Sequence, residues 1–161
     1  MKLSKALLDQ LKSITKTPTQ PTGAQLNVKG DRQSLQCVVL ETNSIGCRLA
    51  RLEVHSKSLA GLTKERLREI SAALSGKLSY LMEPIVPIEF DIDAMVAQLR
   101  SNPPRKEDTK TQYYELTLQE GGSIALRRFE KIVGEPRTAI PADITREVLM
   151  RLVDDLSESV S

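Results

Sequence analysis

Hydrophobic positions along the chain change their spacing several times, and the changes predict an ordered series of helices and strands. Apolar residues three to four positions apart, typical of an amphipathic helix, cover 2–15, 63–81 and 144–157. Alternation of apolar and polar residues, typical of half-buried strands, begins at residue 35. The alternating segments are 35–39, 45–49, 85–92, 112–119 and 123–133. The chain therefore mixes helices with strands that can pair as hairpins.

Two segments need a more specific interpretation. Alternation places Leu49 inward, but the same phase would then turn Leu52 and Val54 outward. A β-bulge near Ala50, which adds one residue to a strand, restores the inward phase. Residues 94–101 fit either a short helix or a returning strand, and we favour the strand.

The chain also repeats part of itself. The segment 44–48 (Ser-Ile-Gly-Cys-Arg) is echoed by 123–127 (Ser-Ile-Ala-Leu-Arg), and 62–67 is echoed by 144–149. In each copy a predicted strand pair is followed by a predicted helix that begins at a threonine, a residue favoured as a helix N-cap. The first predicted ββα repeat covers 35–82 and the second covers 111–158. The connecting strands between them cover 85–101.

These elements predict an α+β fold. We expect an antiparallel sheet of five to six strands, built from the two ββα repeats, with two helices packed on one face. An N-terminal helix precedes this domain. Residues 1–34 are assigned to that helix and to a flexible linker, because Pro18, Pro21 and Gly23 do not continue a helix. Residues 35–161 are assigned to a single α+β domain.

Composition and charge narrow the setting. With 161 residues and 40% hydrophobic content the chain suits one domain, and an aromatic fraction of 3% predicts an aliphatic core. A net charge of +2 and the few aromatic residues disfavour nucleic-acid binding, which needs a basic surface or exposed rings. The N-terminus does not resemble a signal peptide, no apolar run is long enough to span a membrane, and there are only two cysteines. We therefore expect a cytoplasmic protein that contacts no membrane.

The two cysteines are the most conspicuous chemical groups. Cys37 and Cys47 would lie opposite each other across the first predicted hairpin. The repeat aligns them with Leu116 and Leu126, which are ordinary core residues, so we interpret both cysteines as small buried hydrophobes and not as a redox or metal site. His55 is the only histidine, which disfavours zinc sites and a Ser-His-Asp triad. No cofactor is predicted, and no catalytic residue is identified.

Arginines at matching places in the two repeats form the leading candidate site. Arg48 and Arg127 are predicted to point outward from the sheet, with Arg51 and Arg128 nearby. Their guanidinium groups would form a patch that binds an anion or a protein partner. The alternative is that they form surface ion pairs with cross-strand glutamates, which contribute only about 0–1 kcal/mol each.

Three carboxylates give a weaker candidate, for a metal. Glu89, Asp91 and Asp93 alternate along one predicted strand, a spacing that suits Mg²⁺ or Ca²⁺ only if further ligands come from elsewhere in the fold. Alternation with Ile88 and Phe90 is equally typical of a half-exposed strand. We therefore favour a solvated face over a metal site.

These observations favour a non-catalytic, cytoplasmic protein-interaction or adaptor module. Its partner would be another protein or a second copy of the same chain. A chaperone-like role is one form that this hypothesis takes. In its number of elements the predicted fold is similar to the small α+β secretion chaperones of bacteria. The order of elements and the typically acidic charge of those chaperones differ, so the likeness stops at this number. The first alternative is a small anion- or ligand-binding domain that uses the arginines on the exposed sheet face. The second, less favoured, is a divalent-metal-dependent enzyme that uses the carboxylates.

Overall fold

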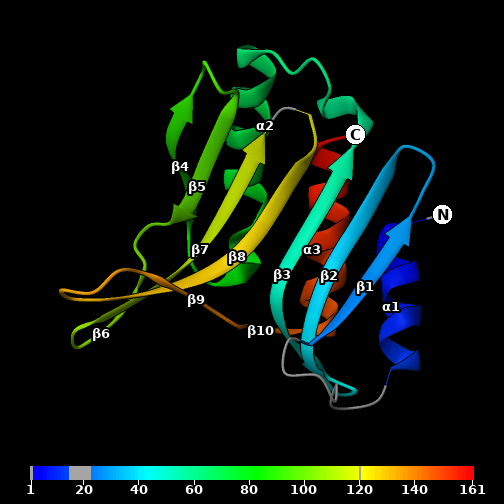
Figure 1. The fold of residues 1–161 in the computed structure, drawn as a ribbon, viewed down its shortest axis with the longest axis horizontal. Coiled ribbons are helices and arrows are strands. Elements are labelled where there is room, and N and C mark those ends of the chain that lie inside the picture. Colours follow the sequence, from blue (N-terminus) through cyan, green and yellow to red (C-terminus); the bar gives the residue numbers. More distant parts are fainter. Residues whose placement is uncertain (1, 15–22, 120) are drawn as a thin grey trace.

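The chain forms one large antiparallel sheet with helices on one side (Figure 1). The computed structural model describes residues 2–14, 23–119 and 121–161. Ten strands lie in this part of the chain, and each pairs antiparallel with a neighbour. They are β1 (Ala24–Lys29), β2 (Gln33–Thr42), β3 (Gly46–Ser56), β4 (Ile85–Asp91), β5 (Val96–Ser101), β6 (Arg105–Glu107), β7 (Lys110–Gln119), β8 (Ser123–Ile132), β9 (Thr138–Ile140) and β10 (Ala142–Thr145).

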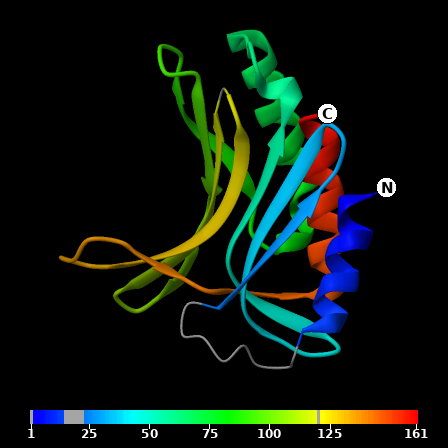
Figure 2. The same ribbon diagram turned by 45° about the vertical axis from the view of Figure 1, so that its right-hand side comes forward.

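The main path of the sheet runs in the order β1-β2-β3-β8-β7-β5-β4. At its centre β3 and β8 pair only from Leu52 opposite Leu126 to His55 opposite Ser123. Where the two strands separate, β10 pairs with β3 and β9 pairs with β8, so backbone groups there stay hydrogen-bonded. The short strands β6 and β9, with the adjoining ends of β7 and β8, extend beyond the helices (Figure 2). We call this extension the arm.

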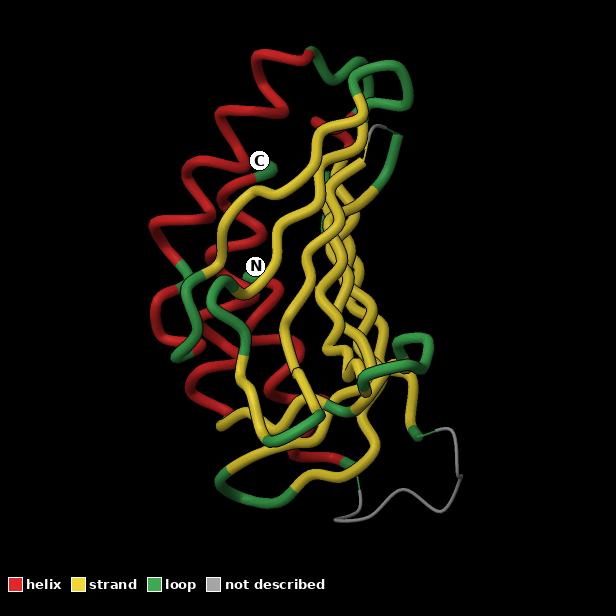
Figure 3. The backbone as a smooth tube through the Cα atoms, turned by 90° about the vertical axis from the view of Figure 1, so that its left-hand side faces the viewer, coloured by secondary structure: helices red, strands yellow, loops and turns green. Residues whose placement is uncertain are grey.

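Three helices pack on the same face of the sheet (Figure 3). They are α1 (Leu3–Ser13), α2 (Lys64–Lys77) and α3 (Arg146–Ser159), with two short 3-10 helices, η1 (Lys57–Leu59) and η2 (Ser79–Leu81). Helix α2 packs on β4 and β5, α3 packs on β3 and β10, and α1 packs on α3 and β1. We call the face turned away from these helices the outer face, and no helix of the described residues covers it.

Local hydrogen bonds set where α2 and α3 begin. The hydroxyl oxygen of Thr63 accepts the backbone N–H of Arg66 at 3.2 Å, and that of Thr145 accepts the backbone N–H of Val148 at 3.1 Å. Each threonine thus satisfies one of the backbone donors that a helix N-terminus leaves free. Helix α1 has no side-chain cap and depends on the packing of its buried leucines.

Aliphatic side chains from the helices and the sheet form the core between the two layers. The largest fully buried side chains are Leu7, Leu11, Leu35, Leu52, Leu59, Leu67, Leu74, Leu78, Ile85, Leu99, Leu116 and Leu118. All but one are leucines, in agreement with the low aromatic content. Because leucines of α1 belong to this same cluster, the N-terminal helix shares the core of the sheet.

The α+β class and the antiparallel sheet are as predicted, but the number and arrangement of elements differ. The sheet has ten strands, not five or six: β6 and β9 lie in segments whose Pro, Gly and charged residues indicate loops, β10 lies between such a segment and the predicted helix, and β1 lies in the segment assigned to the linker. All three helices share one layer; the sequence predicts two helices there and leaves open whether the N-terminal helix docks on the domain. Residues 24–29, assigned to the linker, form the edge strand β1 against β2. The flexible linker predicted before them falls on residues 15–22, which lie outside the described residues.

Both specific interpretations of the alternating pattern are confirmed. Residues 94–101 contain the strand β5, which pairs with β4 and β7. The consecutive β2 residues Val38 and Val39 pair with Arg51 and Leu49 of β3. Ala50, which lies between these two β3 residues, therefore has no partner in the β2–β3 ladder. This bulge lets Leu49 and Leu52 both point into the core.

Candidate functional site

The pairing register determines which side chains lie on the outer face. Cross-strand partners in an antiparallel sheet point to the same side, and successive residues along a strand alternate. Leu116 and Leu126 pair across β7 and β8 and are buried in the core under the helices. Their neighbours Glu115 and Arg127, which also pair with each other, therefore point to the outer face.

Residues around Glu115 form what we call the arginine–aromatic cluster. It combines three arginines, two aromatic rings and one carboxylate. Its members are Arg100 from β5, Tyr113 and Glu115 from β7, Arg127 and Phe129 from β8, and Arg137, which precedes β9. Strand pairing brings them together, because Glu115 lies between Arg100 and Arg127 in the sheet, and Tyr113 lies opposite Phe129.

Glu115 is the buried centre of the cluster. Its side chain is 6% exposed, whereas those of Arg100 and Arg137 are 35% and 37% exposed. Arg100 Nε and Arg137 Nη1 both donate to Glu115 Oε2 at 2.7 Å. Burial on its own would raise the pKa of Glu115, but the hydrogen bonds from Arg137 and Arg100 outweigh it and lower the pKa below its ordinary value of 4.5. The carboxylate is therefore ionised at neutral pH and fixed between two guanidinium groups.

Aromatic rings orient the guanidinium groups of the cluster. The guanidinium carbon of Arg137 lies 3.9 Å from the centroid of the Phe129 ring, and that of Arg127 lies 5.2 Å from the same centroid. The guanidinium carbon of Arg100 lies 5.3 Å from the centroid of the Tyr113 ring. Cation–π contacts within ~6 Å contribute about 0.5–2 kcal/mol. The arginines are thus held in place although they remain partly exposed.

A pocket opens beside the cluster, where the sheet continues into the arm. It has a volume of about 480 Å³ and is lined by Arg100, Ser101, Pro104, Thr111, Tyr113, Lys131 and Arg137. The same face continues along the arm, because Thr111 pairs with Lys106 of β6 and with Lys131 of β8. Cationic side chains therefore extend from the cluster onto the outer face of the arm.

A second buried carboxylate, Glu53 of β3, lies on the outer face. Its side chain is 8% exposed, and it meets Arg51 Nη2 at 2.5 Å and His55 Nε2 at 3.3 Å. Both partners belong to the same strand, two positions before and after it, and point to the same side. Arg51, a predicted site residue, thus belongs to a local ion pair whose charges balance.

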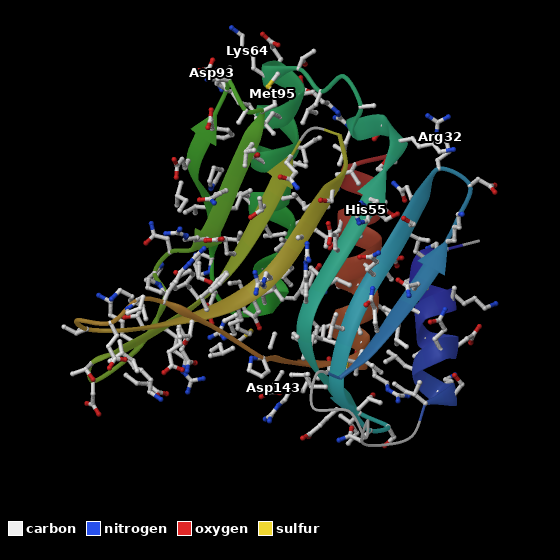
Figure 4. All side chains as sticks on the ribbon, in the orientation of Figure 1. Arg32, His55, Lys64, Asp93, Met95 and Asp143 are labelled. Atoms are coloured by element: carbon white, nitrogen blue, oxygen red, sulfur yellow. The ribbon has the colours of Figure 1, made fainter. Side chains whose placement is uncertain are left out.

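The predicted pair of arginines, Arg48 and Arg127, has separate partners. Arg48 Nε donates to Asp143 Oδ1 at 2.8 Å across the β3–β10 ladder, at the place labelled by Asp143 in Figure 4. These two side chains are 46% and 68% exposed, as in an ordinary surface ion pair. Arg127 belongs instead to the arginine–aromatic cluster.

Arg128 lies on the helix side of the sheet, in contrast to its predicted place on the exposed face. Adjacent strand residues point to opposite sides, so Arg128 points inward when Arg127 points outward. It is 8% exposed, its Nη2 donates to Glu83 Oε2 at 3.0 Å, and its guanidinium carbon lies 4.5 Å from the centroid of the Tyr114 ring. These contacts give Arg128 a structural role between the sheet and the segment after η2.

The three predicted metal candidates lie at exposed positions near one edge of the sheet. Glu89 and Asp91 belong to the edge strand β4, and Asp93 lies in the turn to β5, where Figure 4 labels it. Asp91 Oδ1 accepts the backbone N–H of Ala94 at 3.1 Å, which closes that turn. Among the described residues, no group of three or more His, Cys, Asp or Glu side chains is placed to hold a metal ion.

Both cysteines are buried and free, but they do not lie opposite each other as predicted. Cys37 pairs with Leu52, and Cys47 pairs with Thr42. The register differs because β2 continues to Thr42, so the turn to β3 begins later than predicted. In that turn Asn43 Oδ1 accepts the backbone N–H groups of Ile45 and Gly46. Burial raises the pKa of Cys37, and it raises that of Cys47 to about 11. Protonated, buried thiols fit the interpretation of both residues as core side chains.

Sequence reasoning identified Arg127 but missed most of the cluster around it. The alternation in 112–119 points Tyr114 inward, which is a signal that its neighbour Tyr113 lies on the outer face. Arg100 and Arg137 have no comparable local signal. Their positions depend on the pairing of β5 with β7 and on the path of the chain before β9.

The chain matches no protein-family model, no curated protein and no solved structure. None of the helices in the described residues combines the length and the apolar character needed to cross a membrane. The geometry of the outer face is therefore the basis for a functional hypothesis.

Proposed function

We propose that this protein is a non-catalytic interaction module whose outer sheet face binds an acidic segment of a protein partner. The observation that carries the proposal is the arginine–aromatic cluster, in which partly exposed arginines and two rings surround one buried carboxylate. Arginine and aromatic residues are enriched in protein interfaces and among the residues that contribute most to binding.

The charge of the face favours an acidic partner. Glu115 compensates one of the three arginine charges in the cluster, and Lys106 and Lys131 add positive charge on the same side of the arm. The remaining positive potential attracts acidic segments, repels basic ones and speeds association. Each guanidinium also has five N–H donors, more than Glu115 uses, so carboxylates of a partner can accept charge-assisted hydrogen bonds.

Pre-orientation of the arginines supports the same proposal. A free arginine side chain loses considerable conformational entropy when a partner immobilises it, at about 0.5–1.5 kcal/mol per side chain. Contacts with Phe129, Tyr113 and Glu115 already restrict the guanidinium groups before a partner arrives. A smaller entropy cost on binding favours a surface used for recognition over an incidental group of charges.

We also propose that the two hairpins and the helices that follow them are duplicated units. Strands β2 and β3 with α2 have the same order as β7 and β8 with α3, apart from the inserted β9 and β10. The two capping threonines support this origin, since each precedes the helix of its unit. In this view the arginine–aromatic cluster developed mainly on the second unit.

Fluorescence anisotropy with a labelled oligo-glutamate peptide tests the proposed function. We expect saturable binding that weakens as salt screens the charges, and no binding of an oligo-lysine peptide of equal length. Arg127→Ala and Arg137→Ala should each weaken binding about fivefold, equivalent to about 1 kcal/mol.

Arg48→Ala is the matched control, because Arg48 is a partly exposed arginine of the sheet that lies outside the cluster. It should change the affinity by less than about twofold, or about 0.4 kcal/mol. Equal losses in Arg48→Ala and Arg127→Ala, no binding of the glutamate peptide, or equal binding of both peptides would contradict the proposal. Binding to a second copy of the chain would appear as self-association in sedimentation experiments, weakened by the same cluster variants.

A further inference from the structure

We infer that the pocket beside Tyr113 binds the phosphoryl group of a phosphate monoester. This arm pocket is the one of about 480 Å³ lined by Arg100, Ser101, Pro104, Thr111, Tyr113, Lys131 and Arg137. The pocket adjoins the proposed binding face. If a partner protein carries the phosphoryl group, the inference therefore rests on the proposed function. A free phosphate monoester offers the same chemistry to the pocket.

Charge balance favours a dianion over a single carboxylate. Arg100, Lys131 and Arg137 line the pocket, and the neighbouring Glu115 supplies one negative charge by bonding both arginines. About two positive charges therefore remain without a compensating carboxylate among the pocket residues. A phosphate monoester carries about −1.5 to −2 at pH 7 and neutralises this excess, whereas a carboxylate neutralises about half of it.

The pocket also supplies hydrogen-bond donors from several directions. Arg100 donates to Glu115 through Nε, and its two terminal Nη groups have no partner among the described contacts. The Tyr113 hydroxyl accepts from Arg137 at 3.3 Å, which leaves its own hydrogen free to donate. These donors match a dianionic phosphoryl group, whose three terminal oxygens are strong acceptors.

Lys131 closes the pocket on the side of the arm. Its Nζ donates to the carbonyl oxygens of Ile132 and Glu135, which hold the ammonium group in place. Those carbonyls are neutral, so the charge of Lys131 is not cancelled by them. Thr111, its cross-strand partner, adds a hydroxyl to the same wall. A fixed lysine beside two oriented arginines is a combination suited to phosphate.

The volume of the pocket indicates that more than a bare phosphate ion can enter. About 480 Å³ lies within the ~300–1,000 Å³ range of ligand pockets and leaves room for the group that carries the phosphoryl oxygens. That group is either a phosphorylated side chain of the partner or a small phosphorylated molecule. The two sources are separated by experiment.

Three labelled peptides that differ at one central position test the protein source. Each is the oligo-glutamate peptide with serine, glutamate or phosphoserine at that position. We expect the phosphoserine peptide to bind about tenfold more tightly than the glutamate peptide. Lys131→Ala and Tyr113→Phe should reduce this ratio to about twofold, whereas Lys106→Ala, on the same side of the arm but outside the pocket, should preserve it.

Phenyl phosphate, titrated into ¹⁵N-labelled protein, tests the small-molecule source. Chemical-shift changes of the Thr111, Tyr113 and Lys131 amides that are lost in Lys131→Ala support the inference. They support it even if no peptide binds; the lack of peptide binding would then overturn only the proposed function. Equal affinity for the glutamate and phosphoserine peptides, together with no shifts from phenyl phosphate, overturns the inference and leaves the proposed function standing. If neither the peptides nor phenyl phosphate bind, the inference and the proposed function are both overturned.

Discussion

Glu53 and Glu115 are both nearly buried on the outer face of the sheet, but they are held in different ways. Glu53 takes its partners from its own strand, two positions before and after it. Glu115 takes Arg100 from β5 and Arg137 from the chain before β9, and Arg127 lies opposite it on β8. Glu53 belongs to a local ion pair, whereas Glu115 is bound by arginines from segments that are distant in the sequence.

The difference shows which charges on this sheet are available for recognition. The Glu53 pair balances one arginine with one carboxylate and therefore leaves no excess charge for a partner. Around Glu115 the positive charge exceeds the negative charge, and aromatic rings fix the direction of the guanidinium groups. An excess of oriented charge has no evident role in holding the sheet together, which is why we connect it with binding.

The largest difference between the two carboxylates should appear in stability. Glu115→Gln removes the charge that accepts hydrogen bonds from two arginines, and we expect it to lower the free energy of unfolding by about 2–3 kcal/mol. Glu53→Gln, which affects one arginine and one histidine, should lower it by about 1 kcal/mol. Urea unfolding followed by circular dichroism measures both. Equal losses would show that the two sites are not different in kind.

The second comparison uses the adjacent residues Arg127 and Arg128, which point to opposite faces. Arg128→Ala leaves Glu83 without its partner and removes the stacking on Tyr114, so we expect a loss of about 2 kcal/mol in the free energy of unfolding. Arg127→Ala should cost less, about 0.5–1 kcal/mol, because its side chain is exposed and loses only the contact with Phe129. Its effect should appear in peptide binding instead. A larger stability loss in Arg127→Ala would contradict the assignment of the faces.

A smaller effect is expected in the pH dependence of stability. Because the folded pKa of Glu115 lies below its ordinary value of 4.5, its contribution is present above that value and is lost as the pH falls through the lower folded pKa. The wild type should therefore lose stability from about pH 5 downward, and Glu115→Gln should lose less over the same range. Unfolding midpoints in urea at a series of pH values measure the two slopes. Identical slopes would contradict the role of Glu115.

Local spacing was sufficient for the elements that depend on local chemistry. The helices that begin after Thr63 and Thr145, the β7–β8 hairpin and the bulge at Ala50 all follow from the pattern of apolar positions. The short strands β6, β9 and β10 do not, because three or four residues form a strand only when a neighbouring edge offers hydrogen bonds. Strand β1 is a different case: its six residues alternate, with Leu26 and Val28 buried, but they lie in the segment that the sequence assigns to a linker.

The candidate site was only partly accessible from the sequence. Arg127 was identified through the repeat, but Arg48, its supposed counterpart, pairs with Asp143 on β10. The cluster needs Arg100 beside Glu115, and this contact exists because β5 pairs with β7 in one particular register. Sites built from several strands depend on which strands pair, and the spacing of apolar residues within one strand does not identify its partner strand.

A map of backbone amide chemical shifts tests the central claim most directly. ¹⁵N-labelled protein is titrated with the oligo-glutamate peptide, and the shift of each assigned amide is followed. We predict that the largest shifts lie in β5, β7 and β8, around Arg100, Tyr113 and Arg127, while α1, α2, α3 and β1 change little. Shifts concentrated in the helices or around Arg48, with the cluster unchanged, would contradict the assignment of the outer face as the binding surface.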